Sequence, residues 1–193
     1  MNAPSTDALE AARLVDRLER LARLDATPDP LNAAQWEALR YLARANRYSR
    51  TPAAVADYLA STRGTVSRTL AALEDKGYLQ REDNPRDGRS VDFALTARGR
   101  KAAQRDPLLA MAADMDASLG AEVARLRRLL QRSLHGSIAR NGGRAFGACL
   151  DCRHFLRQAN PGAPAPHHCG LLDVALSDAE SRLLCVEQEP LAA

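Results

Sequence analysis

The chain has 193 residues and a formal net charge of +3, and 46% of its residues are hydrophobic, which is ordinary for a soluble globular protein. No apolar run approaches the roughly 20 residues that span a bilayer, and the N-terminus has no apolar signal-peptide core. We therefore expect a cytoplasmic protein that does not bind membranes. In that reducing compartment the four cysteines are not expected to form two stable disulfides.

Charge and cysteines are unevenly distributed along the chain. Residues 141–193 hold four Arg and six acidic residues, a net charge of −2, whereas residues 1–140 carry a net charge of +5. All four cysteines lie beyond residue 148. The chain is therefore expected to have a basic body at 1–140 and a Cys-rich tail at 141–193.

The two ends of the basic body are predicted to be amphipathic helices. Leu and Ala recur at helical spacing over residues 6–25 and again over 121–140. A further helical region runs from Thr96 to about residue 119, with a kink or restart at Pro107. The end helices are too apolar on one face to stand alone, which favours dimerisation through them.

The middle of the body, about residues 31–100, begins with three helices. One is predicted over 33–46, with Asn32 as N-cap and Gln35 as its capping-box partner. Thr51-Pro52 begins a short second helix, because Thr caps well and Pro suits the first helical position. The third begins after Ser61-Thr62 and ends at Gly77.

A charged hairpin follows, with a turn-rich segment at 82–89 and a return strand at 91–95. Helix, short helix, capped helix and charged hairpin, in this order, are typical of a winged helix-turn-helix. We therefore predict a mainly α fold with a small β-hairpin wing, an α+β winged helix-turn-helix with a helical dimerisation region.

The third helix has the pattern of a recognition helix, which buries one face on its scaffold and offers the other to the major groove. Val66, Leu70 and Leu73 form the inner face. Arg offers two donors to guanine, Ser and Thr hydroxyls suit phosphates or base edges, and glycine lets the backbone approach DNA. The candidate DNA-binding residues on this helix are Arg63, Gly64, Thr65, Ser67 and Arg68.

The hairpin tip carries two further candidates, Arg86 and Arg89, on either side of Asp87-Gly88. Arginines on a thin β-ribbon can enter a narrow minor groove, where the negative potential is strongest. A single such Arg is more often a solvated loop charge. Two arginines at the hairpin tip, together with the polar residues of the preceding helix, favour DNA binding.

Several motifs resemble those of the MarR family of bacterial regulators. They are Thr51-Pro-Ala-Ala-Val-Ala-Asp-Tyr-Leu, Ser61-Thr-Arg-Gly-Thr-Val-Ser-Arg-Thr-Leu, Leu73-Glu-Asp-Lys-Gly-Tyr, Asn84-Pro-Arg-Asp-Gly-Arg-Ser and Leu95-Thr-Ala-Arg-Gly. The resemblance covers roughly residues 5–140 and is specific in its wing motif.

This resemblance implies a homodimer that binds double-stranded DNA at a pseudo-palindromic operator, usually as a repressor relieved by a ligand or by redox chemistry. It implies that the residues of the recognition helix contact the major groove, that Arg86 and Arg89 are wing arginines, and that Asp87 orients one of them. Members of the family often bind small aromatic acids between their two lobes. Many also have Arg or Lys where Gly88 stands, so the wing of this chain is expected to make fewer contacts.

The Cys-rich tail has the sequence Cys149-Leu-Asp-Cys152, then Cys169 after sixteen residues and Cys185 after fifteen more. Gly and Pro recur along the tail and interrupt regular structure, and only residues 177–185 are predicted to be helical. A tail of about 50 residues with few apolar groups is near the size at which metal or disulfide links become necessary. Four thiolates can supply such a link, because metal-binding energy becomes folding energy.

Three states of the cysteines compete. The first is a 4Fe–4S cluster, which takes four thiolates; the spacing resembles that of high-potential iron–sulfur proteins, although the tail has fewer aromatic residues. The second is zinc, whose ribbon sites usually show two close cysteine pairs, whereas this tail has one. The third is reduced thiols, or a disulfide switch between Cys149 and Cys152. His154, His167 and His168 are expected to be surface residues or neighbours of the ligands rather than ligands.

The sequence therefore predicts a dimeric, sequence-specific DNA-binding regulator whose C-terminal metal centre modulates operator affinity. The alternative is an iron–sulfur electron-transfer protein, or a structural zinc protein, in which the winged helix serves protein contacts. No hydrolase triad, phosphate loop or carboxylate pair is present, so we do not expect an enzyme.

Overall fold

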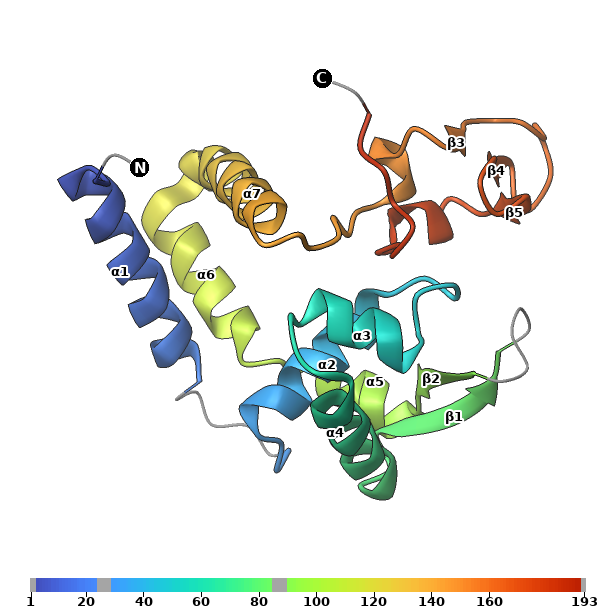
Figure 1. The fold of residues 1–193 in the computed structure, drawn as a ribbon, viewed down its shortest axis with the longest axis horizontal. Coiled ribbons are helices and arrows are strands. Elements are labelled where there is room, and N and C mark those ends of the chain that lie inside the picture. Colours follow the sequence, from blue (N-terminus) through green and yellow to red (C-terminus); the bar gives the residue numbers. More distant parts are fainter. Residues whose placement is uncertain (1–2, 24–28, 85–89, 192–193) are drawn as a thin grey trace.

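The computed structural model describes residues 3–23, 29–84 and 90–191, which form three regions (Figure 1). A winged-helix unit (residues 29–84 and 90–105) occupies the centre. Three outer helices lie to one side of it, and a Cys-rich module (residues 141–191) lies over its α3 side. The predicted mainly helical fold with a small antiparallel hairpin is confirmed.

The winged-helix unit contains the predicted helices, and their caps are those expected. Asn32 and Gln35 exchange side-chain and backbone hydrogen bonds in a capping box, and the hydroxyls of Thr51 and Thr62 accept from the Ala54 and Thr65 amides. The elements are α2 (Ala33–Arg44), α3 (Pro52–Tyr58), α4 (Arg63–Asp75), β1 (Leu79–Asp83), β2 (Val91–Leu95) and α5 (Ala97–Ala103).

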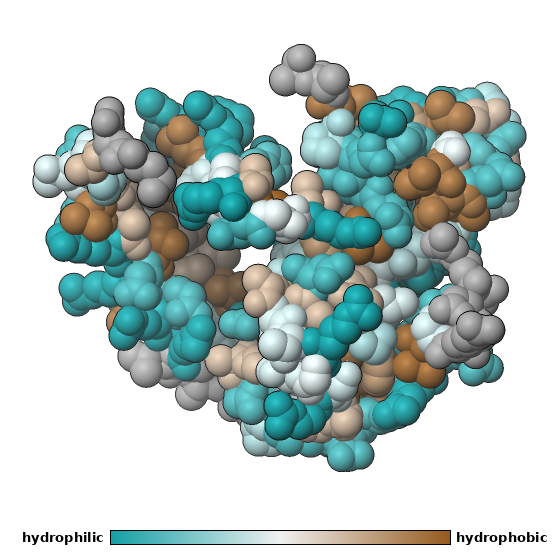
Figure 2. Space-filling view, in the orientation of Figure 1, coloured by the Kyte–Doolittle hydropathy of each residue, from teal (hydrophilic) through white to brown (hydrophobic). Residues whose placement is uncertain are grey.

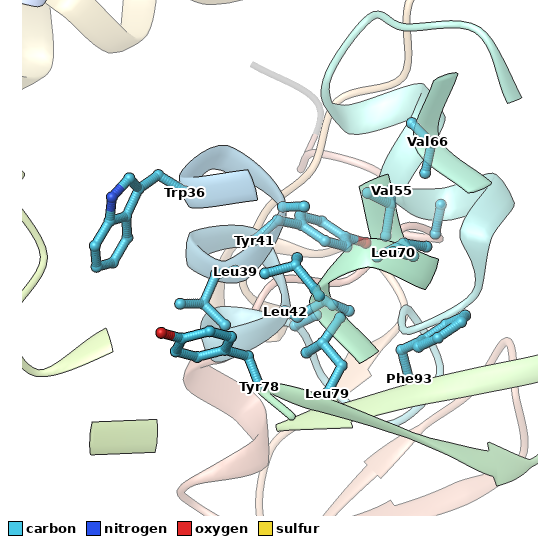
Figure 3. Close-up of a cluster of buried hydrophobic side chains, with 14 of the residues drawn as sticks. Trp36, Leu39, Tyr41, Leu42, Val55, Val66, Leu70, Tyr78, Leu79 and Phe93 are labelled. Atoms are coloured by element: carbon cyan, nitrogen blue, oxygen red, sulfur yellow. The ribbon is translucent and has the colours of Figure 1, made fainter. Parts of the chain in front are cut away.

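One apolar core holds these elements together (Figure 3). Leu39 and Tyr41 from α2 meet Val55 from α3 and Leu70 from α4, and all four are fully buried. Tyr78, just before β1, closes the core below α2 and donates a hydrogen bond to the buried carboxylate of Asp29. Because α2, α3 and α4 share this core, the position of α4 depends on both other helices.

At two positions of this unit the backbone geometry explains why the residue is glycine. Gly77 follows α4 with a φ of +75°, a left-handed conformation that glycine adopts without strain. At Gly99 a Cβ atom would lie 2.1 Å from the Tyr78 carbonyl oxygen, so the close packing of α5 on the β1 end of the unit requires glycine.

The outer helices are α1 (Thr6–Ala22), α6 (Leu108–Leu119) and α7 (Val123–Arg140). The expected break at Pro107 is present, since α5 ends at Ala103 and α6 restarts at Leu108. A two-pronged contact from Arg40 Nε to the Asp106 carboxylate, at 2.7 and 2.8 Å, ties this break to α2. Within the described residues the outer helices bury almost no side chains, and they expose large apolar ones: Leu9, Leu14, Val15, Leu18, Leu21, Leu109, Leu119, Leu129, Leu130 and Leu134 (Figure 2).

The Cys-rich module is built from short pieces: the 3-10 turns η2 (Cys149–Asp151) and η3 (Glu180–Arg182), and a three-stranded antiparallel sheet of β3 (Phe155–Leu156), β4 (His167–Cys169) and β5 (Val174–Leu176). The predicted helix over 177–185 is wrong. Ser177 and Glu180 exchange hydrogen bonds that start a turn, but the backbone is extended at Leu183, and Leu184 then bonds to the end of α2.

No helix in the described part of the chain is both long enough and apolar enough to cross a membrane.

Candidate nucleic-acid interface and thiol cluster

The outer face of α4 presents the five predicted DNA-binding residues to solvent. Arg63, Gly64, Thr65, Ser67 and Arg68 are all exposed. The opposite face of the same helix, with Val66, Leu70 and Leu73, is fully buried in the core. The helix therefore has the two faces that major-groove recognition requires, although the role of each exposed side chain stays a prediction.

Local hydrogen bonds organise the first turns of this face. The hydroxyls of Thr62 and Thr65 lie 2.9 Å apart, and the Thr62 hydroxyl also caps the Thr65 amide. Arg68 Nε lies 3.4 Å from the Gly64 carbonyl oxygen, so the Arg68 guanidinium group runs back along the helix toward its N-terminus. No atom lies within 4 Å of the place where a Gly64 Cβ would stand, which leaves the backbone accessible to a ligand.

The wing is anchored at its base. β1 and β2 pair from Leu79–Leu95 to Asp83–Val91, and Arg81 forms an ion pair of 2.9 Å with Glu74 of α4. This partly exposed contact links the base of the hairpin to the recognition helix. Arg86, Asp87, Gly88 and Arg89 lie outside the described residues, so their predicted roles stay predictions.

A cleft of about 640 Å³ separates the wing and α3 from the Cys-rich module. Its walls include four arginines, Arg47, Arg50, Arg63 and Arg144, together with five acidic residues, Asp57, Glu82, Asp83, Asp92 and Glu187. Charges of both signs line it, so the cleft does not attract anions uniformly. It places the module beside the start of α4.

The backbone of the Cys-rich module brings its four cysteines together. Cys149 and Cys152 flank the η2 turn, and the Cys152 amide donates to the Cys149 carbonyl. A bridge between Gly147 and Cys185 brings the last cysteine beside this turn. The pairing of Phe155 with Cys169 across β3 and β4 brings the third cysteine to the same place.

Burial and mutual proximity change the acidity of these thiols. The pKa of Cys149 is raised to about 12, mainly by burial and then by electrostatic repulsion from Cys185, Cys169 and Cys152, in that order. Burial also raises the pKa of Cys185, while hydrogen bonds from Asn46, the Glu187 backbone and Ser49 oppose the rise. All four cysteines are free thiols, and only Cys169 is partly exposed.

The three histidines of the module have different surroundings. His167 is buried and uses both ring nitrogens, since Nδ1 accepts from the Gln158 amide and Nε2 lies 3.0 Å from Asp178. His168 Nε2 lies 3.1 Å from Asp173. The Nε2 atom of His154 is buried without a hydrogen bond, 3.3 Å from Glu189. Of the residues that the structure describes, His154 Nε2 is thus the buried side-chain polar atom that lacks a hydrogen bond, although the Glu189 carboxylate lies close to it.

Among the described residues, no three or more His, Cys, Asp or Glu side chains are arranged to hold a metal ion. A single zinc ion requires Zn–S distances of about 2.3 Å, which places its thiolates closer together than those around a multi-iron cluster. The four cysteines of this chain supply the soft donor set that either group requires.

Sequence reasoning missed two buried polar residues beside the cluster, Asn46 and Ser49. Both are fully buried in the loop between α2 and α3, and both contact the Cys-rich module. Their positions in the sequence look like an ordinary helix end followed by a turn. They bond to each other within the loop, and the docked module covers them from outside.

The chain matches a family model described as the MarR family over residues 29–90. It is 34% identical over 101 residues to an uncharacterised HTH-type transcriptional regulator of Mycobacterium leprae (strain TN), and the match spans 51% of this chain and 69% of that protein.

Solved structures of similar fold include wild-type MarR of E. coli in its apo form, with 27% identity and a TM-score of 0.54, covering 69% of this chain and 99% of that one. The complex of S. aureus MepR with DNA has a TM-score of 0.55 at 20% identity, covering 70% of this chain and 99% of that one. This second likeness concerns the fold alone.

Proposed function

This chain belongs to the MarR family of transcription regulators, and from this premise we propose that it is a homodimeric repressor that binds double-stranded DNA at a pseudo-palindromic operator. The observation that carries the proposal is that α4 has an exposed polar and basic face opposite a buried apolar face. MepR, which shares the fold, has been solved with DNA. Members of the family are regulators and not enzymes, which agrees with the absence of catalytic motifs in the sequence.

DNA binding is tested by fluorescence anisotropy with a duplex selected from a random-sequence pool by the protein itself. We expect affinity to fall steeply with salt, because arginines release counterions from phosphates. Arg68→Ala is expected to weaken binding about 5- to 150-fold and to relax the base preference. Arg86→Ala tests the wing in the same assay.

The matched control is Arg157→Ala, which removes an exposed arginine from the Cys-rich module, away from α4. It is expected to bind the duplex as the native chain does. If Arg68→Ala also binds normally, the assignment of α4 as the recognition helix fails.

The homodimer is supported by the exposed leucines of the outer helices. Leu14 of α1 and Leu134 of α7 are more than half exposed, and contiguous apolar surface of this kind marks an interface. Leu14→Glu and Leu134→Glu are expected to shift the chain from dimer to monomer in sedimentation velocity. Leu171→Glu, at an exposed leucine of the Cys-rich module, is expected to leave the dimer intact, and a native chain that sediments as a monomer would contradict the proposal.

The four cysteines are proposed to hold a metal centre that modulates operator binding. Their convergence in one cluster supports this, and the four-cysteine sequence pattern with a single close pair favours a 4Fe–4S cluster over zinc, the alternative. When bound, either group would link four thiolates and thereby stabilise a module that has little apolar core of its own. The electron-transfer alternative is less well supported, because the family consists of transcription regulators. A small aromatic effector remains a prediction of the family resemblance.

A further inference from the structure

The last segment of the Cys-rich module is hydrogen-bonded into the winged-helix unit. The Leu184 amide donates to the Arg44 carbonyl at the end of α2, and the Asn46 amide donates back to the Leu184 carbonyl, both at 2.8 Å. The Leu184 side chain joins the apolar core of the winged-helix unit. Cys185 is thus held directly against the loop that connects α2 to α3.

Two buried side chains of this loop contact the cysteine and its neighbour. Burial raises the pKa of the Cys185 thiol, and hydrogen bonding from Asn46 and Ser49 lowers it, so both side chains lie beside this sulfur. The Ser49 hydroxyl also accepts from the Val186 amide at 2.9 Å and lies 2.7 Å from Asn46 Oδ1. The buried side-chain amide of Asn46 and the buried hydroxyl of Ser49 are costly to leave without partners. A displacement of the Cys185 sulfur is therefore expected to move these two side chains.

The same loop holds the DNA-binding elements in place. The Ser49 carbonyl accepts from the Tyr41 hydroxyl at 2.6 Å, and the Arg50 carbonyl accepts from the Phe93 amide of β2 at 3.0 Å. The next residue, Thr51, is the N-cap of α3. A displacement at Ser49 is therefore passed within two residues to the wing strand and to the helix that packs on α4.

A second contact runs in parallel from the start of the module. The Phe146 ring, shortly before Cys149, packs edge-on against Tyr41 of α2 and Tyr58 of α3, with ring centroids 5.8 and 5.1 Å apart. Figure 1 shows the module resting on the α3 side, with α4 on the far side of the unit. The module reaches α4 through α2, α3 and the loop between them.

We propose that Asn46 and Ser49 are positioning residues that couple the ligation of Cys185 to the placement of α3 and the wing, so that metal-free protein binds its operator more weakly than loaded protein. This rests on the proposed function. Ligation fixes the sulfur, and the sulfur fixes the two side chains. In the metal-free thiol form only the contacts with the loop hold the sulfur, and the loop is expected to gain alternative positions. The coupling lies within each winged-helix unit and requires no change in the spacing of the two lobes.

The test compares the affinity of loaded and of chelator-treated, thiol-reduced protein for the selected duplex at one salt concentration. For the native chain the loaded form is expected to bind at least about fivefold more tightly, the lower end of usual allosteric coupling. In Ser49→Ala this ratio is expected to approach one, and a chelator is expected to remove the metal faster than from the native chain. Ser49→Thr keeps the hydroxyl and is expected to restore both properties.

The matched control is Arg47→Ala, at the same junction. Arg47 bonds to Glu180 and to the Ala175 carbonyl of the module but not to Cys185, so its loss is expected to leave the ratio as in the native chain. A loaded, folded Ser49→Ala whose ratio equals the native ratio overturns the coupling. A native chain that binds no duplex in either form overturns the proposed function instead.

Hydrogen exchange of the native chain gives a second measurement that needs no variant. On metal removal the amides of Val186 and Phe93 are expected to exchange faster, because both bond to the loop between α2 and α3. Faster exchange confined to β3, β4 and β5, with Phe93 unchanged, would overturn the proposal.

Discussion

The winged-helix unit and the Cys-rich module differ in what their buried side chains are. The unit buries Leu39, Tyr41, Val55, Leu70 and further apolar residues from every one of its helices. The module buries three of its four cysteines, together with His167 and Leu176, and lends Leu184 to the core of its neighbour. Hydrophobic packing can hold the first region alone, whereas we propose that the second depends on ligation of its thiols and on docking.

This difference bears on regulation. A region that is stable by apolar packing provides a fixed DNA-binding surface, and a region held by thiols changes stability with the state of its ligands. The docked segment at 184–186 connects the module to the winged-helix unit, so we expect a structural change in the module to alter the unit.

The largest effect is expected from removing one thiol. Cys149→Ser takes away a proposed ligand that interacts with all three other cysteines, so metal content should fall to background and the module should become accessible to protease. The winged-helix unit should keep a thermal transition of its own, because all of its buried apolar core except Leu184 lies outside the module. His168→Ala, at a partly exposed histidine, is the control and should retain the metal. Loss of both regions together in Cys149→Ser would show that they are not stabilised differently.

A smaller effect is expected from Leu184→Ala, which tests the link between the two regions. Leu184 is only 9% exposed, and truncating such a side chain costs about 2–5 kcal/mol of the free energy of unfolding. Chemical denaturation should show this loss in the transition of the winged-helix unit, although the residue belongs to the module. Leu171→Ala, at a residue that is 45% exposed, should change stability by no more than about 0.5 kcal/mol. Equal effects of the two substitutions would mean that Leu184 does not anchor the module.

The smallest effect is expected from Gly64→Ala on the face of α4. The added methyl group meets no protein atom within 4 Å, so the helix should gain about 0.5–1 kcal/mol of stability while affinity for the selected duplex falls. Gly136→Ala in α7 meets equally open space and should give the same gain without the loss of affinity. If Gly64→Ala binds DNA as the native chain does, the backbone at Gly64 does not approach DNA closely.

The two regions also differ in how far the sequence predicts them. The helices of the winged-helix unit carry local signals: the Asn32–Gln35 capping box, Thr62 before α4 and Gly77 after it, with apolar residues at helical spacing between. The inner and outer faces of α4 follow from the same spacing, which is why the buried and exposed residues there agree with the prediction.

The module could not be predicted in this way. Strands of two or three residues, such as β3 and β4, are too short to show alternation, and their pairing of Phe155 with Cys169 joins distant positions. The segment at 177–185 has helical composition, but its bonds to α2 override that preference. Asn46 and Ser49 became candidates only when the docked module gave them partners.

The central claim is that a DNA-binding unit of the MarR family carries a thiol-held metal centre. The most direct test is the metal content and visible absorption spectrum of anaerobically purified protein. The account predicts four irons per chain and a broad visible absorption that air or a chelator removes, together with weaker binding of the selected duplex after that removal. One zinc per chain without visible absorption would support the alternative centre, and protein that contains neither metal and binds the duplex unchanged would contradict the claim.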